Sequence, residues 1–131
     1  MKNLPKGSRV GYDLTEELKT DSLIGIIPVG YWHGYPRALS NIGTFSVKGK
    51  KVKLLGRVSM NMIILDLTGL KVKAGDEVNI IGGKEDKKEH YAEADIMAQD
   101  ADTINYEITT RINPIIKRFY RINPLIKRFL K

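Results

Sequence analysis

Short apolar runs separated by turn residues fill most of the chain. Five of these runs have the length and the β-branched content of strands, and they are Leu23–Val29, Ile42–Val47, Lys51–Leu55, Asn61–Leu67 and Glu77–Ile81. Lys48-Gly49-Lys50 lies between the second and third runs and predicts a hairpin. Because no helical period separates these runs, the pattern predicts a mainly β fold, an antiparallel Greek-key-like barrel or sandwich.

Helices are expected only near the C-terminal third, where one or two short ones fit. Ala92–Ala98 is rich in alanine, and Asp102 offers a side-chain acceptor that could cap a second short helix running through Tyr106. The stretch Gly30–Arg37 combines glycines with aromatic residues and predicts a loop. Lys84–Glu89 is polar and predicts an exposed turn.

The C-terminal tail contains a repeat. Arg111–Tyr120 is followed by Arg121–Leu130, and the two copies differ at two of ten positions. The apolar spacing with Asn and Pro at the start fits a helix, whereas Asn-Pro equally marks a turn before a strand, so both alternatives stay open. We expect residues 1–120 to form one β domain and residues 121–131 to be a basic extension of it.

Length and composition narrow the class of protein. The 131 residues fit one domain and cannot hold a (β/α)₈ barrel of roughly 250 residues. There is no cysteine, and His33 and His90 are the only imidazoles, so no metal site is expected. No apolar stretch approaches the ~20 residues of a membrane span, and the first residues lack the apolar run of a secretory signal, which together predict a cytoplasmic protein.

The net charge of +7 comes from the tail. All 15 acidic residues lie in residues 1–110, where an equal number of Lys and Arg balances them, and the other seven basic residues follow. A basic surface spread over the whole fold, as nucleic-acid binders often show, is therefore not expected. The tail alone could support salt-dependent binding to nucleic acid or an anionic membrane, and we retain a non-catalytic binding module as an alternative.

Candidate chemistry is sparse when the residues are taken by themselves. The glycines of the stretch from Gly30 to Gly34 lack the spacing of a phosphate loop or a dinucleotide fingerprint. Four tyrosines are expected at strand ends, in loops or on a short helix: Tyr12, Tyr31, Tyr35 and Tyr106. Their hydroxyls could face a cavity, or their rings could pack inside while the hydroxyls reach the surface.

Five segments together resemble the C-terminal domain of alanine racemase, in that family's order and at its spacing. They are Val10-Gly11-Tyr12, Ile26-Ile27-Pro28-Val29-Gly30-Tyr31 with Gly34-Tyr35-Pro36-Arg37, Gly56-Arg57-Val58-Ser59-Met60-Asn61, Gly75-Asp76-Glu77-Val78 and Thr103-Ile104-Asn105-Tyr106-Glu107. The resemblance implies a β domain that follows an N-terminal (β/α)₈ barrel, which holds pyridoxal 5'-phosphate on a lysine. It also implies a homodimer in which this domain packs across the barrel of the second subunit.

The implied reaction is the interconversion of L- and D-alanine, which supplies D-alanine for cell-wall peptidoglycan. Inversion at Cα needs a base on each face, and the resemblance assigns the second base to Tyr12. Since an ordinary phenol ionises near pH 10, such a base requires a cationic neighbour. This chain without the barrel is expected to be inactive and to bind the cofactor only weakly.

The resemblance also implies the other roles in the site. Tyr106 matches the tyrosine that donates to the cofactor phosphate, Tyr31 matches the tyrosine that narrows the substrate channel, and Met60 matches the residue whose backbone meets the substrate carboxylate. Three further residues match positions that line the outer corridor, where two cations would attract a carboxylate: Arg37, Arg57 and Ile104.

Three positions depart from the family pattern. His33 and Asn61 stand where the family carries aspartates, and Asp13 stands where a small residue follows the tyrosine. The loss of two carboxylates is expected to leave the corridor arginines less compensated. Substrate choice therefore stays open, and a racemase of serine or another small amino acid is the alternative to an alanine enzyme.

Overall fold

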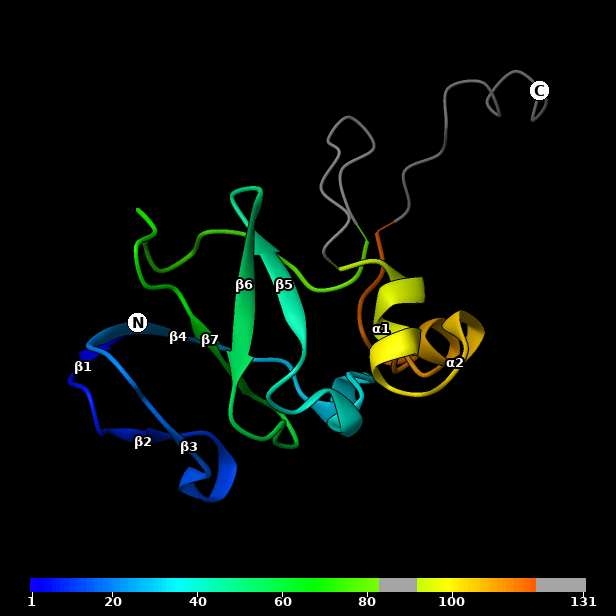
Figure 1. Ribbon diagram of the computed structural model, residues 1–131. Coiled ribbons are helices and arrows are strands. Elements are labelled where there is room, and N and C mark those ends of the chain that lie inside the picture. Colours follow the sequence, from blue (N-terminus) through cyan, green and yellow to red (C-terminus); the bar gives the residue numbers. More distant parts are fainter. Residues whose placement is uncertain (83–91, 120–131) are drawn as a thin grey trace, which may run out of the picture.

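The computed structural model describes residues 1–82 and 92–119. Within them the chain forms a six-stranded antiparallel sheet, a two-stranded hairpin and two short α-helices, so the mainly β prediction is confirmed. Figure 1 shows α1 and α2 together on one side of the molecule and the N-terminal hairpin on the other.

The large sheet has the spatial order β1-β4-β7-β6-β5-β8. These strands are β1 (Lys2–Leu4), β4 (Ser22–Ile27), β5 (Thr44–Val47), β6 (Lys50–Leu55), β7 (Ile63–Asp66) and β8 (Val78–Asn79). The five predicted strands are all present, mostly with shorter bounds. The turn between β5 and β6 has positive φ at Lys48 and Gly49, which is typical of the two-residue hairpins that match strand twist.

Three short N-terminal strands were not predicted. β1 forms the edge of the sheet beside β4, and β2 (Arg9–Val10) pairs with β3 (Glu16–Glu17) in a separate hairpin. Each has only two or three residues, which is too short for an alternating pattern to stand out in the sequence.

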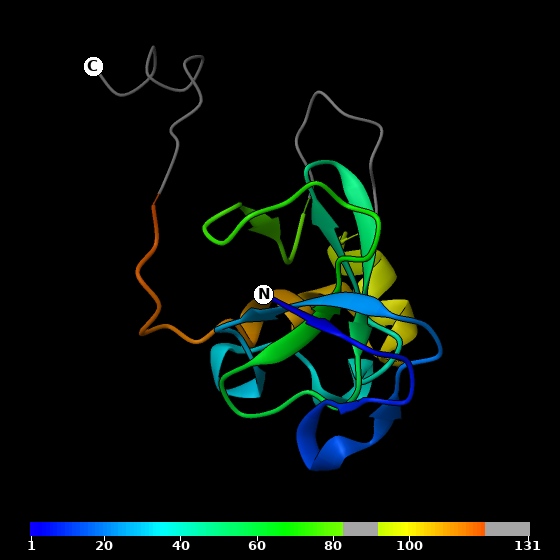
Figure 2. The same ribbon diagram turned by 90° about the vertical axis from the view of Figure 1, so that its left-hand side faces the viewer.

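The core lies between the sheet and the helices, because the buried cluster takes side chains from both. In Figure 2 the two helices lie behind the strands of the sheet. Alternation along β6 places Val52 and Leu54 inside and Lys51 and Lys53 outside. Phe45 and Ile63 are also buried, and Ile108 adds the contribution of α2 to the same cluster. Because side chains from the strands and from α2 belong to one buried cluster, the helices are fixed relative to the loops at the ends of the strands.

The two helices are α1 (Ala94–Asp100) and α2 (Asn105–Thr110). The prediction that Asp102 caps the second helix is wrong, because Ile104 occupies the N-cap position and no side chain caps it. Asp102 lies in the turn before it with φ of 54°. The amide of Asn105 instead donates to the Asp95 carboxylate at 2.6 Å, which links the starts of both helices.

The first copy of the tail repeat forms a turn within residues 111–119, with no helix or strand. Ile116 N–H donates to the Asn113 carbonyl at 3.1 Å. The second copy, including the expected extension 121–131, and the polar turn Lys84–Glu89 lie outside the described residues. None of the helices in the described ranges is long and apolar enough to cross a membrane.

Candidate functional site

Two loops meet backbone to backbone at Gly11 and Gly56. A Cβ on Gly11 would lie 2.7 Å from the Gly56 Cα, and a Cβ on Gly56 would lie 2.6 Å from the Gly11 Cα. Both residues have positive φ, 84° and 77°. Only glycine satisfies both the conformation and the close approach, so this contact fixes the loop that begins with Tyr12 against the loop that carries Arg57.

Tyr12 begins the 3-10 helix η1 (Tyr12–Leu14), and its side chain is 53% exposed. The Arg37 guanidinium carbon lies 5.9 Å from the centroid of the Tyr12 ring, within cation–π range. Arg37 is held there because its Nη1 donates to the Val58 carbonyl at 2.8 Å. The phenol therefore has an open face toward solvent and a fixed cation beside its ring.

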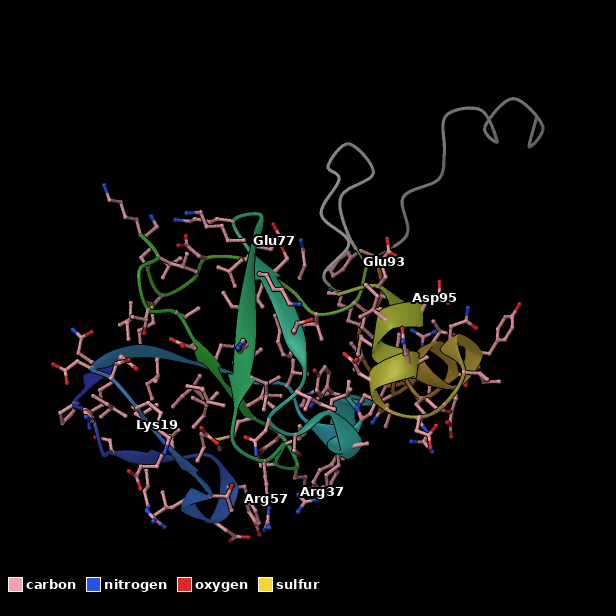
Figure 3. All side chains as sticks on the ribbon, viewed as in Figure 1. Lys19, Arg37, Arg57, Glu77, Glu93 and Asp95 are labelled. Atoms are coloured by element: carbon pink, nitrogen blue, oxygen red, sulfur yellow. The ribbon has the colours of Figure 1, made fainter. Side chains whose placement is uncertain are left out.

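Asp13 and Arg57 form an ion pair beside Tyr12, with 3.4 Å between Oδ2 and Nη1. Both side chains are about half exposed, so the pair orients its loops more than it stabilises the fold. Asp13 has φ of 61°, a conformation that Asp tolerates better than most residues. Figure 3 shows the labelled Arg37 and Arg57 side chains at the same end of the molecule.

A hollow of about 400 Å³ opens next to Tyr12. Its walls come from η1 and from the loop between β6 and β7, including Arg57, Met60, Asn61 and Met62. The structure thus brings together Tyr12, Arg57 and Met60, which are three of the predicted site residues.

Tyr31 lies in a second segment that is bound to the same loop. Gly30 permits the approach, since a Cβ there would lie 2.2 Å from the Ser59 carbonyl oxygen. Tyr31 N–H donates to Ser59 at 3.1 Å, and Trp32 N–H donates to Met60 at 2.9 Å. The predicted loop Gly30–Arg37 is more regular than expected, because it contains the 3-10 helix η2 (Tyr31–His33) and ends where a second one, η3 (Arg37–Leu39), begins.

A second hollow of about 370 Å³ lies on this segment. Tyr31, Arg37 and Arg111 are among its lining residues, so Arg37 lines it while its guanidinium also lies beside the Tyr12 ring. Arg111 forms an ion pair with Glu107 at 2.5 Å.

Ile104 and Tyr106 are not grouped with Tyr12. They lie at the N-cap and in the first turn of α2, and neither lines the hollow beside Tyr12 or the one beside Tyr31. The Tyr106 side chain is 73% exposed, and its hydroxyl has no hydrogen-bond partner in the described part of the chain. An exposed neutral O–H donor of this kind fits a phosphate that approaches from outside the domain.

Tyr35 has a different role from the other three tyrosines. It is 2% exposed, its ring stacks on Phe45 at 5.2 Å, and its hydroxyl is buried against Gly43 with no partner among the described residues. Burial, with the nearby Asp100 carboxylate, raises the pKa of the Tyr35 hydroxyl well above its usual range. The expectation that this hydroxyl faces a cavity or the surface is wrong, because the ring completes the core.

The three departures from the family pattern have local explanations. The His33 Nδ1 accepts the Gly30 N–H at 3.2 Å and closes η2, and Asn61 lines the hollow beside Tyr12. Asp13 supplies the carboxylate that pairs with Arg57. The expectation of less compensated arginines is therefore wrong for Arg57, because a carboxylate from the loop of Tyr12 neutralises it.

The fold and these surfaces define a mainly β domain that presents a tyrosine, two arginines and a second tyrosine on open faces. Residues 1–120 match the family model described as the alanine racemase C-terminal domain, and the chain belongs to this family. It is 41% identical over 122 residues to an alanine racemase of Halothermothrix orenii, a match that covers 92% of the chain and 31% of that protein. It is also 49% identical over 90 residues to a lysine racemase of Proteus mirabilis, covering 68% of the chain and 22% of that protein.

Solved structures agree with this assignment. The crystal structure of alanine racemase from Streptomyces lavendulae matches with a TM-score of 0.85 at 34% identity, covering 95% of the chain and 32% of that structure. The alanine racemase of Bartonella henselae, solved with covalently bound pyridoxal phosphate, matches with a TM-score of 0.80 at 34% identity over 92% of the chain and 32% of that structure. The chain thus spans about a third of the length of these relatives.

Proposed function

We propose that the chain serves as the C-terminal domain of a pyridoxal-phosphate-dependent alanine racemase and supplies Tyr12 as the second base. The observation that carries this proposal is the exposed Tyr12 ring, with Arg37 at 5.9 Å and the hollow beside it. An acid or base that serves another chain must be accessible, and it must also be rigid. The exposure of the ring supports the first requirement, and the contact of Gly11 with Gly56 supports the second.

The separation of Tyr12 from Tyr106 supports a dimeric enzyme. Within one chain Tyr12 begins η1 whereas Tyr106 lies in the first turn of α2, and the two phenols line no common hollow. Two barrels could therefore each receive one of them, the N-terminal barrel of the same subunit and the barrel of a second subunit.

The cytoplasmic location remains a prediction of the sequence.

Pyridoxal phosphate, when bound, withdraws electrons from the substrate Cα and so makes its proton removable. Tyr106 would hold the phosphate through its exposed hydroxyl, and the Tyr12 Oη would take or return the proton on one face of Cα. Tyr31 would narrow the entrance, and the Met60 backbone would meet the substrate carboxylate. Arg37 would attract that carboxylate from solvent and maintain a positive charge beside the phenol.

The test is a chimera in which the N-terminal part of the Halothermothrix orenii racemase precedes this chain. We expect it to bind pyridoxal phosphate and to interconvert the alanine enantiomers, with serine and lysine assayed alongside as competing substrates. Y12F should lower kcat by roughly 10²- to 10⁴-fold with cofactor binding unchanged. Y106F is the matched control, since loss of a charge-assisted hydrogen bond should raise the cofactor dissociation constant by about ten-fold or more.

Two results would contradict the proposal. One is a chimera that folds and binds the cofactor yet does not racemise alanine, serine or lysine. The other is an unchanged racemisation rate in Y12F.

A further inference from the structure

The C-terminal segment Arg111–Asn113, which we name the strap, contacts the entrance loop Tyr31–Gly34. Gly34 has φ of +102°, and a Cβ on it would lie 2.3 Å from the Arg111 carbonyl oxygen and 2.8 Å from the Ile112 Cα. The two backbones are therefore in direct contact, although about eighty positions of sequence separate them. No side chain other than hydrogen fits between the strap and the loop.

Asn113 makes the polar contacts of the strap. Its side-chain Nδ2 donates to the Trp32 carbonyl at 2.9 Å, and its backbone N–H donates to the His33 carbonyl at 3.2 Å. The amide is oriented by a third bond, because its Oδ1 accepts the Ile115 N–H at 3.0 Å. An acceptor fixed on one side leaves the NH₂ group directed at Trp32.

The entrance loop is thus bound on both of its sides. Its N–H groups at Tyr31 and Trp32 donate to the loop between β6 and β7, at Ser59 and Met60. Its carbonyl groups at Trp32 and His33 accept from the strap. Loss of the strap bonds would leave only one side held, and the loop would open more often.

We propose that Asn113 is a positioning residue that fixes the entrance loop and with it Tyr31. The inference rests on the proposed function for the role of Tyr31 at the substrate entrance. Asn113 itself lies outside both hollows and acts through the backbone of Trp32. Its effect is therefore on substrate entry and binding, and the proton transfer at Tyr12 is independent of it.

Hydrogen–deuterium exchange on the full 131-residue chain tests the strap without any racemase activity. N113D retains the oxygen that accepts Ile115 N–H and removes the donor to Trp32, whereas N113A removes both. In both variants the amides of Tyr31 and Trp32 should exchange roughly five-fold faster, the effect of losing one ordinary hydrogen bond. N3A, at an exposed position of β1, is the matched control and should leave these amides unchanged.

The amides of β4 separate a local effect from general destabilisation. Faster exchange at Tyr31 and Trp32 with β4 unchanged supports the proposal. Exchange in N113D equal to that of the unsubstituted chain overturns it, since the donor to Trp32 would then hold nothing. An equal acceleration in β4 and in the entrance loop overturns it as well.

The chimera with an N-terminal barrel supplies the functional readout. N113D should raise KM several-fold with kcat unchanged, and N113S, which retains a hydroxyl donor, should recover part of the loss. A fall in kcat at constant KM overturns the positioning role. A chimera that is inactive without any substitution contradicts the proposed function, and the exchange experiment still decides whether the strap holds the loop.

Discussion

Replacement of Gly56 by alanine measures how tightly the loop of Tyr12 is held. The chain offers a matched control in Gly69, because both glycines have φ of +77°. A Cβ on Gly56 would lie 2.6 Å from the Gly11 Cα and 3.1 Å from the Val10 carbonyl oxygen, whereas a Cβ on Gly69 would meet nothing within 4 Å. The two substitutions therefore share the positive φ, and only G56A adds the steric contact at its buried position.

The magnitude follows from these two contributions. A left-handed conformation costs an L-residue about 1–2 kcal/mol, which both variants lose. Forcing a methyl group into a closed backbone contact adds roughly 1–3 kcal/mol in G56A alone. We expect a decrease in the free energy of unfolding of about 1–2 kcal/mol for G69A and of about 2–5 kcal/mol for G56A.

Urea denaturation of the chain, followed by circular dichroism and by the fluorescence of Trp32, its single tryptophan, gives both values. The slope of the free energy of unfolding against urea concentration should be the same in G56A, G69A and the unsubstituted chain, since the surface exposed on unfolding does not change. Equal losses in G56A and G69A would refute the reasoning, because the backbone contact that fixes Tyr12 would then carry no energy.

Three further predictions concern charge and burial. The hydrogen bonds from the Lys48 ammonium and the Lys73 N–H lower the pKa of Asp76, so its stabilisation is present at neutral pH and is lost as the pH falls through that lowered value. D76N should therefore be less stable than the unsubstituted chain at neutral pH, and the difference in unfolding midpoint should vanish as the pH falls below that lowered pKa. The free energy of unfolding of Y35F should be about 1 kcal/mol higher than that of the unsubstituted chain at neutral pH, because Y35F removes a buried hydroxyl without a partner in the described residues. The raised pKa of Tyr35 means that its neutral form is favoured in the fold, so Y35F should also lose less stability above about pH 10 in thermal melts. A double-mutant cycle of D13N and R57Q should give a coupling of at most about 1 kcal/mol, falling with added salt, because both side chains are half exposed.

The pattern of apolar residues located the main strands because each falls in a short apolar run bounded by turn residues, and in β6 and β7 burial also repeats every second residue. Val52 and Leu54 against Lys51 and Lys53 are the clearest case. The short strands at the N-terminus have no room for such a repeat. β1 forms on the edge that β4 offers, and β2 and β3 form by pairing with each other. The cap assigned to Asp102 failed because α2 begins only at Asn105, with Ile104 at its N-cap, so that the Asp102 side chain lies too far along the chain to cap it.

In the candidate site too, some residues could be predicted from the sequence and others only from the tertiary structure. The sequence by itself indicated Tyr12, Tyr31, Met60 and Tyr106, because their resemblance to the family lies in local segments that can be compared residue by residue. Only the tertiary structure paired Asp13 with Arg57, set Arg37 beside the phenol, turned Tyr35 into the core and joined Asn113 to Trp32. These contacts join segments that lie up to 81 positions apart, and no local pattern specifies which distant backbone will come close enough to bond.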